Sequence, residues 1–365
     1  MTDAPSPITW KKTVLDATFR SEGVAVADVN GDGRLDVLAG DFWYEAPDWT
    51  PHEIRPPGEY DPATGYSQSF INFSADLTGN GRPDLIVIGF PGEAALWYEN
   101  PGAAGGHWRE HTLWRSACNE SPIFADVNGD GRPELVFAYD ESVMAWYEPG
   151  TDPTQPWIAH DVSLPGAPGT KKYAHGLGVG DLNGDGRADI LTTAGYWLAP
   201  EDPRSGPWPF VEADLGPDAA QMRVYDVNGD GRADVISSSA HLKGIWWHEQ
   251  TAGGLVSHLI DDTWSQSHAV ELADINGDGL MDFVIGKRFW AHGPKGDVEA
   301  NAPCVLYWYE LCRSEGRVEW RRHLIDDDSG VGTQFEVVDL NGDGLLDVVV
   351  SNKKRVFVFE QQRSG

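Results

Sequence analysis

The fold is decided by Asp28-Val29-Asn30-Gly31-Asp32-Gly33-Arg34-Leu35-Asp36, because the chain repeats this stretch along its length. Six copies keep the pattern D-x-N-x-D-G-x-x-[DE] and begin at Asp28, Asp126, Asp181, Asp226, Asp274 and Asp339. A seventh copy, at Asp76, has Thr78 and Asn80 in place of the usual Asn and Asp. Side-chain oxygens at alternate positions can converge on one point, and the glycine permits a sharp turn, as in the first half of an EF-hand loop. Apolar runs such as Val348-Val349-Val350 follow the loops, so each loop is expected to join strands rather than helices.

The loops predict structural cation sites. Their first, third, fifth and ninth side chains are oxygen donors, the ligand type that calcium prefers, with magnesium as the alternative ion. Metal-free acidic turns are the competing interpretation. The candidate ligands are Asp28, Asn30, Asp32, Asp36, Asp126, Asn128, Asp130, Glu134, Asp181, Asn183, Asp185, Asp189, Asp226, Asn228, Asp230, Asp234, Asp274, Asn276, Asp278, Asp282, Asp339, Asn341, Asp343 and Asp347.

The spacing of the repeat predicts an all-β, seven-bladed β-propeller. Successive motifs begin 45 to 65 residues apart, which suits a propeller blade. Each repeat contains short apolar segments, an aromatic box such as Trp97-Tyr98-Glu99, and a strand with a Trp or His signature, which together indicate four strands. The last repeat ends before its fourth strand. We therefore expect residues 8–14 to complete the seventh blade and close the ring, and the whole chain, 1–365, to be one domain.

Composition restricts the class of protein. The 27 basic and 57 acidic residues give a net charge of −30, which argues against nucleic acid as a partner, although acidic loops account for much of it. Three cysteines do not make a disulfide framework, and no apolar run is long enough to span a membrane. No signal peptide is visible, so the expected location is the cytoplasm, or outside the cell if a signal has been removed. The oligomeric state is left open.

Two sets of residues on the innermost strands are expected to face the axis. Six places before each motif come Glu22, Phe70, Glu120, His175, Ala220, His268 and Thr333, and three places before come Ala25, Phe73, Ile123, Gly178, Arg223, Glu271 and Glu336. These positions differ from blade to blade, whereas structural positions repeat. By the same criterion the repeated His52, His111, His160, His258 and His323 are expected to be structural, and the tryptophan boxes to form core between blades.

Basic residues are expected in loops around the same end of the axis, where they favour an anionic ligand or an oxyanion. The full candidate site has His175, His268 and Tyr173 as catalytic residues. The candidate substrate-binding residues are Glu22, Gln68, Glu120, Lys172, Arg223, His241, Lys243, Glu271, Lys287, Arg288, His292 and Gln334. A histidine pair suits acid–base chemistry near neutral pH, such as removing a proton beside a carbonyl while protonating a leaving oxygen. The same residues could instead ligate a catalytic divalent metal.

The chain resembles known families at two levels. The repeated loop with apolar flanks resembles the FG-GAP/VCBS repeat of seven-bladed propellers. Tyr173-Ala174-His175-Gly176, Ser267-His268 and Gly286-Lys287-Arg288 resemble the propeller domain of aldos-2-ulose dehydratase/isomerase. This second resemblance implies removal of water from keto-sugars such as 1,5-anhydrofructose, with His175 as the leading base. The isomerase step of that family belongs to cupin domains, which this sequence does not contain.

The functional prediction is therefore a carbon–oxygen lyase of carbohydrate metabolism, acting on a keto-sugar in an axial pocket. A lyase acting on polysaccharides or glycosides that contain uronic acid is a close variant. The alternative of another class is a non-catalytic propeller that binds carbohydrate or protein. A lectin of this shape would repeat its binding residues from blade to blade, and the candidate residues do not repeat.

Overall fold

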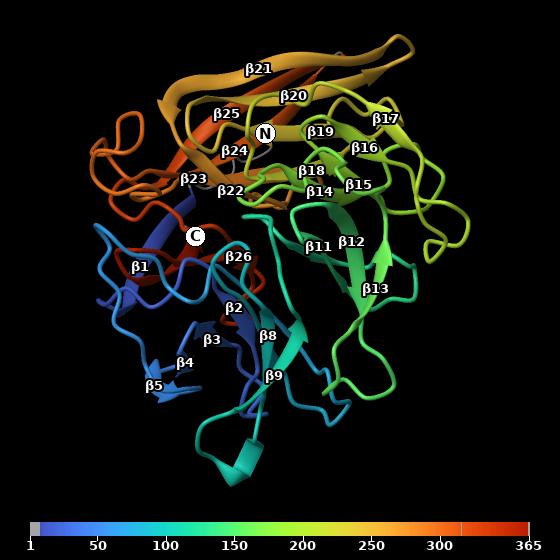
Figure 1. Cartoon of the computed structure of the whole chain (residues 1–365). Helices are drawn as coiled ribbons and strands as arrows, with labels where there is room; N and C mark the ends of the chain where they lie inside the picture. Colours follow the sequence, from blue (N-terminus) through green and yellow to red (C-terminus); the bar gives the residue numbers. More distant parts are fainter. Residues whose placement is uncertain (1–7, 315, 364–365) are drawn as a thin grey trace.

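The computed structural model describes residues 8–314 and 316–363, which form β-strands and one short 3-10 helix, η1 (Gly102–Ala104). Figure 1 shows the sheets arranged around a central region. Consecutive strands of each repeat are antiparallel neighbours. Among the described residues, no helix is long and apolar enough to cross a membrane.

Five sheets contain four strands each. One sheet contains β2 (Ala25–Ala27), β3 (Asp36–Ala39), β4 (Phe42–Glu45) and β5 (Thr50–Glu53), and the next contains β6 (Ile71–Ala75), β7 (Asp84–Ile88), β8 (Ala95–Glu99) and β9 (Arg109–Trp114). A third sheet contains β10 (Ile123–Ala125), β11 (Glu134–Tyr139), β12 (Val143–Glu148) and β13 (Ile158–Asp161). A fourth contains β22 (Ser267–Ala273), β23 (Asp282–Lys287), β24 (Leu306–Ser314) and β25 (Arg317–Asp326). The fifth contains β26 (Phe335–Val338), β27 (Asp347–Ser351), β28 (Val356–Arg363) and β1 (Ile8–Asp16).

That fifth sheet joins the two ends of the chain. The pairing of β1 with β28 runs from Ile8 opposite Arg363 to Asp16 opposite Val356. Lys11 and Glu360 form an ion pair across it at 2.5 Å. The N-terminal strand therefore completes the last repeat, as predicted, and extends two residues beyond the predicted 8–14. This pairing covers the edge that β28 would otherwise expose.

The remaining strands form one eight-stranded sheet, where seven separate blades had been predicted. It contains two antiparallel runs. The first is β14 (Leu177–Gly180), β15 (Asp189–Thr192), β16 (Gly195–Trp197) and β17 (Phe210–Glu212), and the second is β18 (Gln221–Tyr225), β19 (Asp234–Ser238), β20 (Lys243–Thr251) and β21 (Gly254–Ser265).

A parallel pairing of β14 with β18 joins these two runs. Glycine explains the merger, because a Cβ on Gly178 would lie 3.0 Å from the Met222 carbonyl oxygen, and one on Gly180 would lie 2.7 Å from Cβ of Val224. The two strands can therefore approach to hydrogen-bonding distance.

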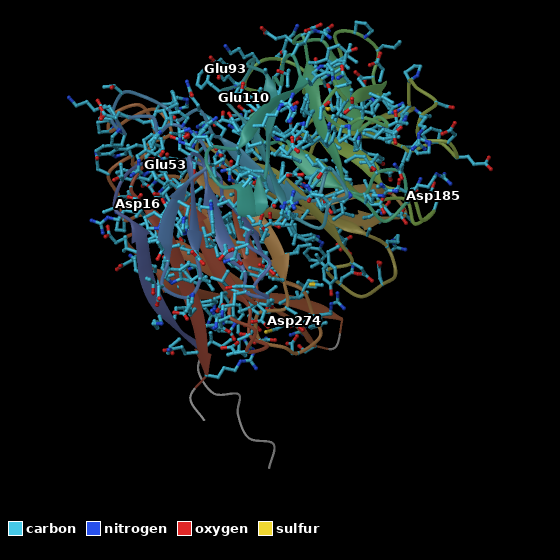
Figure 2. The ribbon with its side chains drawn as sticks, turned by 90° about the horizontal axis from the view of Figure 1, so that it is seen from below. Asp16, Glu53, Glu93, Glu110, Asp185 and Asp274 are labelled. Carbon is cyan, nitrogen blue, oxygen red and sulfur yellow. The ribbon has the colours of Figure 1, made fainter. Side chains whose placement is uncertain are left out.

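The first strand of each repeat is the innermost one. The first strands of successive sheets adjoin each other, as β2 does with β6, β14 with β18, and β18 with β22. The acidic loops connect first and second strands, so they share one face of the ring. Figure 2 labels Asp185 and Asp274, from two of these loops, on separate parts of the molecule.

A repeated contact explains the histidines that were expected to be structural. Each stacks on the tryptophan of its aromatic box, with ring centroids 4.2–4.5 Å apart. Each also places Nε2 2.8–3.0 Å from the glutamate that ends the box. The five His–Glu pairs are His52–Glu45, His111–Glu99, His160–Glu148, His258–Glu249 and His323–Glu310. These contacts link the third and fourth strands of a sheet.

Candidate functional site

A cavity of about 510 Å³ lies near the residues six places before the motifs. It is lined by Tyr66, Phe70, Phe90, Glu120, Tyr173, His175, Asp218, His241, Ala291 and His292. The structure thus brings together five of the predicted site residues, namely Glu120, Tyr173, His175, His241 and His292. We call this space the axial pocket. Its aromatic rings and acid–base side chains match the makeup of a small-ligand site.

The axial pocket has a buried charged network beneath its histidines. Arg288 forms an ion pair with Glu120, and Glu120 Oε2 lies 3.1 Å from His175 Nε2. Burial by itself would raise the pKa of Glu120, but Arg288 and His175 hold it well below its usual range. Burial lowers the pKa of His175, yet the Glu120 carboxylate outweighs burial, and the net shift is upward.

His175 is oriented by the backbone. Its Nδ1 donates a hydrogen bond to the Tyr173 carbonyl oxygen at 2.7 Å, so Nε2 is the nitrogen that faces the pocket network. That Nε2 also lies 3.2 Å from Nε2 of His241. Tyr173 has a positive φ of 66°, a backbone conformation that few non-glycine residues adopt, and the residue is 46% exposed. The strained turn therefore both exposes the tyrosine and supplies the acceptor that fixes the histidine.

His268 lies beside this network, fully buried, with Nε2 3.3 Å from Arg288 Nη1. A β-bulge between His268 and Val270 sets its position, and Ala269 in the bulge has φ 49°. Bulges commonly redirect side chains beside functional sites. Burial, and then Arg288, lower the pKa of His268 well below its usual value, so its imidazole is neutral at pH 7.

A second histidine group lies at the rim of the pocket. His292 Nδ1 is 2.7 Å from Asp297 Oδ1, and His241 Nδ1 is 3.6 Å from the same oxygen. Although burial opposes it, the nearby His241 and the hydrogen bonds from His292 lower the pKa of Asp297. Two sets of side chains have the geometry to hold a metal ion, namely Glu120, His175 and His268, and His241, His292 and Asp297.

Three predicted site residues belong elsewhere. Arg223, Glu271 and Gln334 line a separate cavity of about 300 Å³, together with Glu336, Phe73 and Phe124. For Arg223 and Glu271 the reason is strand geometry: they lie three residues further along their strands than the set that contains Glu120 and His175, which is a distance of about 10 Å. We call this second space the lower cavity, and in it Arg223 forms an ion pair with Glu271. Across the axis, Gln221 donates to the Thr333 carbonyl oxygen at 2.8 Å.

Five further candidates also do not line the axial pocket. Gln68 is exposed, and Lys243 pairs with Glu299 at 2.7 Å. Lys287 donates to Ser265 Oγ at 2.9 Å, and Lys172 lies over the Phe90 and Tyr173 rings. Glu22 is buried and accepts a hydrogen bond from the Ser67 hydroxyl.

Sequence reasoning missed Tyr66, Phe90, Asp218 and Asp297. These residues lie in loops that do not repeat between sheets, and positions counted back from the motif do not reach them.

The acidic loops share one hydrogen-bonding pattern. In the first loop Asp28 accepts from the backbone N–H groups of Gly31, Asp32 and Gly33 at 2.8–3.0 Å. Asp36 is buried and accepts from Val29 and Ala46, and burial raises its pKa to about 6.

The donor atoms of these loops fit calcium or magnesium, since they are carboxylate and amide oxygens. In the described chain, however, no loop gathers one oxygen from each of its three acidic side chains within 4.8 Å. In the eroded loop Asp76 likewise accepts hydrogen bonds from the backbone N–H groups of Asn80 and Gly81. The turn itself therefore does not need the full set of oxygen ligands.

The fold and its repeats define the class: the chain is a β-propeller with four-stranded antiparallel units and FG-GAP-like repeats. The FG-GAP-like repeat family matches residues 76–137, 126–192 and 226–285, and an EF-hand family matches residues 332–348. Among curated proteins, no match to this chain is found.

Solved propeller structures resemble the chain at low sequence identity. A BBS1N chain in complex with ARL6DN is 10% identical, with a TM-score of 0.57 and coverage of 99% of both chains. YCF48 from Cyanidioschyzon merolae is 12% identical, with a TM-score of 0.51, and 96% of this chain and 98% of that chain are covered. An Agrocybe aegerita lectin that recognises non-reducing terminal N-acetylglucosamine is 18% identical, with a TM-score of 0.49, and 98% of this chain and 86% of that chain are covered. The likenesses to BBS1N and YCF48 show the fold alone.

Proposed function

We propose that the protein is a carbon–oxygen lyase that eliminates water, or an alcohol, from a keto-sugar held in the axial pocket. The observation that carries the proposal is the His175–His241 contact above the buried Glu120–Arg288 pair. Elimination needs one group that removes a proton from carbon and one that protonates the leaving oxygen. Two imidazoles whose environments differ supply such a pair.

The environments of the two histidines suggest their roles. Glu120 favours the charged form of His175, so we assign His175 as the acid that protonates the leaving oxygen. With Nε2 of His175 donating, Nε2 of His241 is the acceptor at 3.2 Å, so we assign His241 as the base. This assignment differs from the expectation from sequence, which gave His175 the role of base and His268 that of its partner.

The aromatic lining supports a carbohydrate as the ligand. Tyr66, Phe70 and Phe90 form a cluster with ring centroids 5.1–5.5 Å apart, and Tyr173 contacts Phe90 at 5.5 Å. Such ring faces pack against the apolar face of a sugar, while histidines and carboxylates bind its hydroxyls. The same lining supports the second candidate function, carbohydrate binding without turnover.

For metals, we propose structural calcium in the acidic loops, with magnesium as the alternative, on the basis of their oxygen donors and the EF-hand match. The two sets of side chains in the axial pocket would suit a transition metal, which would supply Lewis-acid polarisation of a carbonyl oxygen.

Ultraviolet absorbance tests the lyase proposal, because elimination creates a conjugated enone or an unsaturated uronate. The substrates are 1,5-anhydrofructose, 2-keto and 3-keto glucosides, and a rhamnose-capped glucuronide. We expect absorbance to rise with a keto-sugar, and the rise to be lost in His175→Ala and His241→Ala. The matched control is His160→Ala, which removes a histidine that also contacts a glutamate but lies outside the pocket.

The substrate that responds also distinguishes the variants of the proposal. A rise with only the glucuronide would favour the uronate lyase. Sugar binding by calorimetry without any rise would refute the lyase and favour a binding protein.

A further inference from the structure

Lys353 is a buried lysine whose amine lies against an aromatic ring. It follows β27, is 4% exposed, and places Nζ 3.9 Å from the centroid of the Tyr66 ring, which lines the axial pocket. Within residues 8–314 and 316–363, its Nζ has no hydrogen bond or ion pair. The next residue, Lys354, instead bonds Asp328 at 2.5 Å. Because burial disfavours an ammonium ion, the environment of Lys353 makes its amine easier to deprotonate than that of an exposed lysine.

Two buried charged groups act on this amine. Burial, with a further contribution from Arg288, lowers the pKa of Lys353 to about 8, although Glu22 opposes the shift. Desolvation and a neighbouring cation are the conditions under which lysine amines act as nucleophiles.

Glu22 supplies an acid in the same region. Burial raises its pKa to about 7, and among the described residues its Oε1 has no hydrogen-bond partner. A carboxyl whose pKa is raised toward neutrality can give or take a proton during reaction at the amine.

We propose that Lys353 captures the carbonyl group of the ligand in the axial pocket as an imine. Nζ attacks the carbonyl carbon and gives a carbinolamine, and the Glu22 carboxyl protonates its hydroxyl, which leaves as water. In forming the carbinolamine the nitrogen passes one proton to the carbonyl oxygen, which becomes the hydroxyl; loss of water then leaves a protonated imine and the Glu22 carboxylate. Its positive charge is accommodated by the face of the Tyr66 ring, which attracts cations.

This inference deepens the proposed function and rests on it for the ketone. A protonated imine withdraws electrons from the neighbouring carbon more strongly than a ketone does, and so makes its proton easier to remove. Lys353 would then activate the substrate, while the histidines of the axial pocket transfer protons.

Reductive trapping tests the imine. The full chain is incubated with 1,5-anhydrofructose, and separately with dihydroxyacetone, in the presence of cyanoborohydride, which reduces protonated imines in preference to ketones. Peptide mass spectrometry then locates the secondary amine. We expect one dominant adduct, on Lys353, and its loss in Lys353→Met and Lys353→Arg. Lys354→Met is the matched control and should keep the adduct. The arginine variant retains charge and length, so it separates loss of the nucleophile from failure to fold.

The outcomes separate this inference from the proposed function. Trapping that is absent, or spread over several lysines, overturns the imine. A rise in absorbance that survives Lys353→Met also overturns it, but leaves the lyase standing. An adduct on Lys353 without any rise in absorbance supports the imine and refutes the lyase.

Discussion

Replacing Glu120 by glutamine tests the buried network directly. The substitution keeps the shape of the side chain but leaves the Arg288 guanidinium buried without its carboxylate. Removing one partner of a buried pair typically costs about 3–5 kcal/mol. We therefore expect Glu120→Gln to lower the free energy of unfolding by about that amount, which is a shift of roughly 1–1.7 M in the urea midpoint for an m-value of about 3 kcal/mol/M.

Glu148 offers a matched control. It also lies between a histidine and an arginine, with His160 at 2.8 Å and Arg204 at 2.6 Å, but Arg204 is 45% exposed. Solvent screens such a pair, so Glu148→Gln should cost only about 0–1 kcal/mol. Equal costs for the two variants would refute the claim that burial makes the Glu120 network special.

The pH dependence gives a second test of the same variant. Glu120 raises the pKa of His175 in the folded protein. The resulting stabilisation is complete below the unfolded pKa of histidine, about 6.5, and is lost as pH rises through the folded value. The deficit of Glu120→Gln should therefore be larger at about pH 5.5 than at about pH 9, where only the Arg288 contribution remains. A deficit independent of pH would show that Glu120 does not act on His175.

Three further predictions concern the rest of the molecule. Removing divalent cations with EGTA should lower the melting temperature, and calcium should restore it; an unchanged melting temperature would identify the loops as metal-free turns. Burial, with Glu271 adding to it, raises the pKa of Glu336 to about 8, so stability falls as pH rises from about 4.5 to 8. Urea titrations should therefore show Glu336→Gln gaining on the wild type across that range, and parallel profiles would contradict this. Deleting β1, so that the chain begins at Ala17, should expose the edge of β28 and cause aggregation, measured by light scattering; a monodisperse product would contradict it.

The strand pattern was predictable because it repeats. Each motif fixes a turn, and a turn between two apolar runs fixes an antiparallel pair, so the order of strands followed from counting. The Ile8–Asp16 strand followed from the same count, since the last repeat lacked a partner for β28. The merger of β14 with β18 was missed because it depends on how closely two backbones approach. Gly178 and Gly180 permit that approach, and sequence gives no value for such a distance.

Only the part of the candidate site that is counted back from the repeated motif along the innermost strands could be predicted from the sequence. Counting back from the motif found Glu120, His175 and His268 at one level of the ring. Counting three residues fewer placed Arg223 and Glu271 in the same pocket, although the structure places them in the lower cavity. Strand alternation predicts which side chains face the axis, but the depth at which they face it decides which cavity they line.

Repeated and non-repeating positions differ in their contacts, and this difference explains where chemistry is possible in this fold. The repeated residues are occupied by structural contacts: the histidines stack on tryptophans and bind glutamates, and the ninth-position carboxylates bind backbone N–H groups. Non-repeating residues beside the axial pocket keep unused hydrogen-bonding capacity, since within the described residues Arg288 Nη2, Glu22 Oε1 and His268 Nδ1 have no hydrogen-bond partner. Buried polar atoms without partners are costly, and a protein tolerates several in one place most readily when a ligand binds there. The unpaired atoms of Arg288, Glu22 and His268 therefore leave hydrogen-bonding capacity for a ligand at the axial end of the molecule.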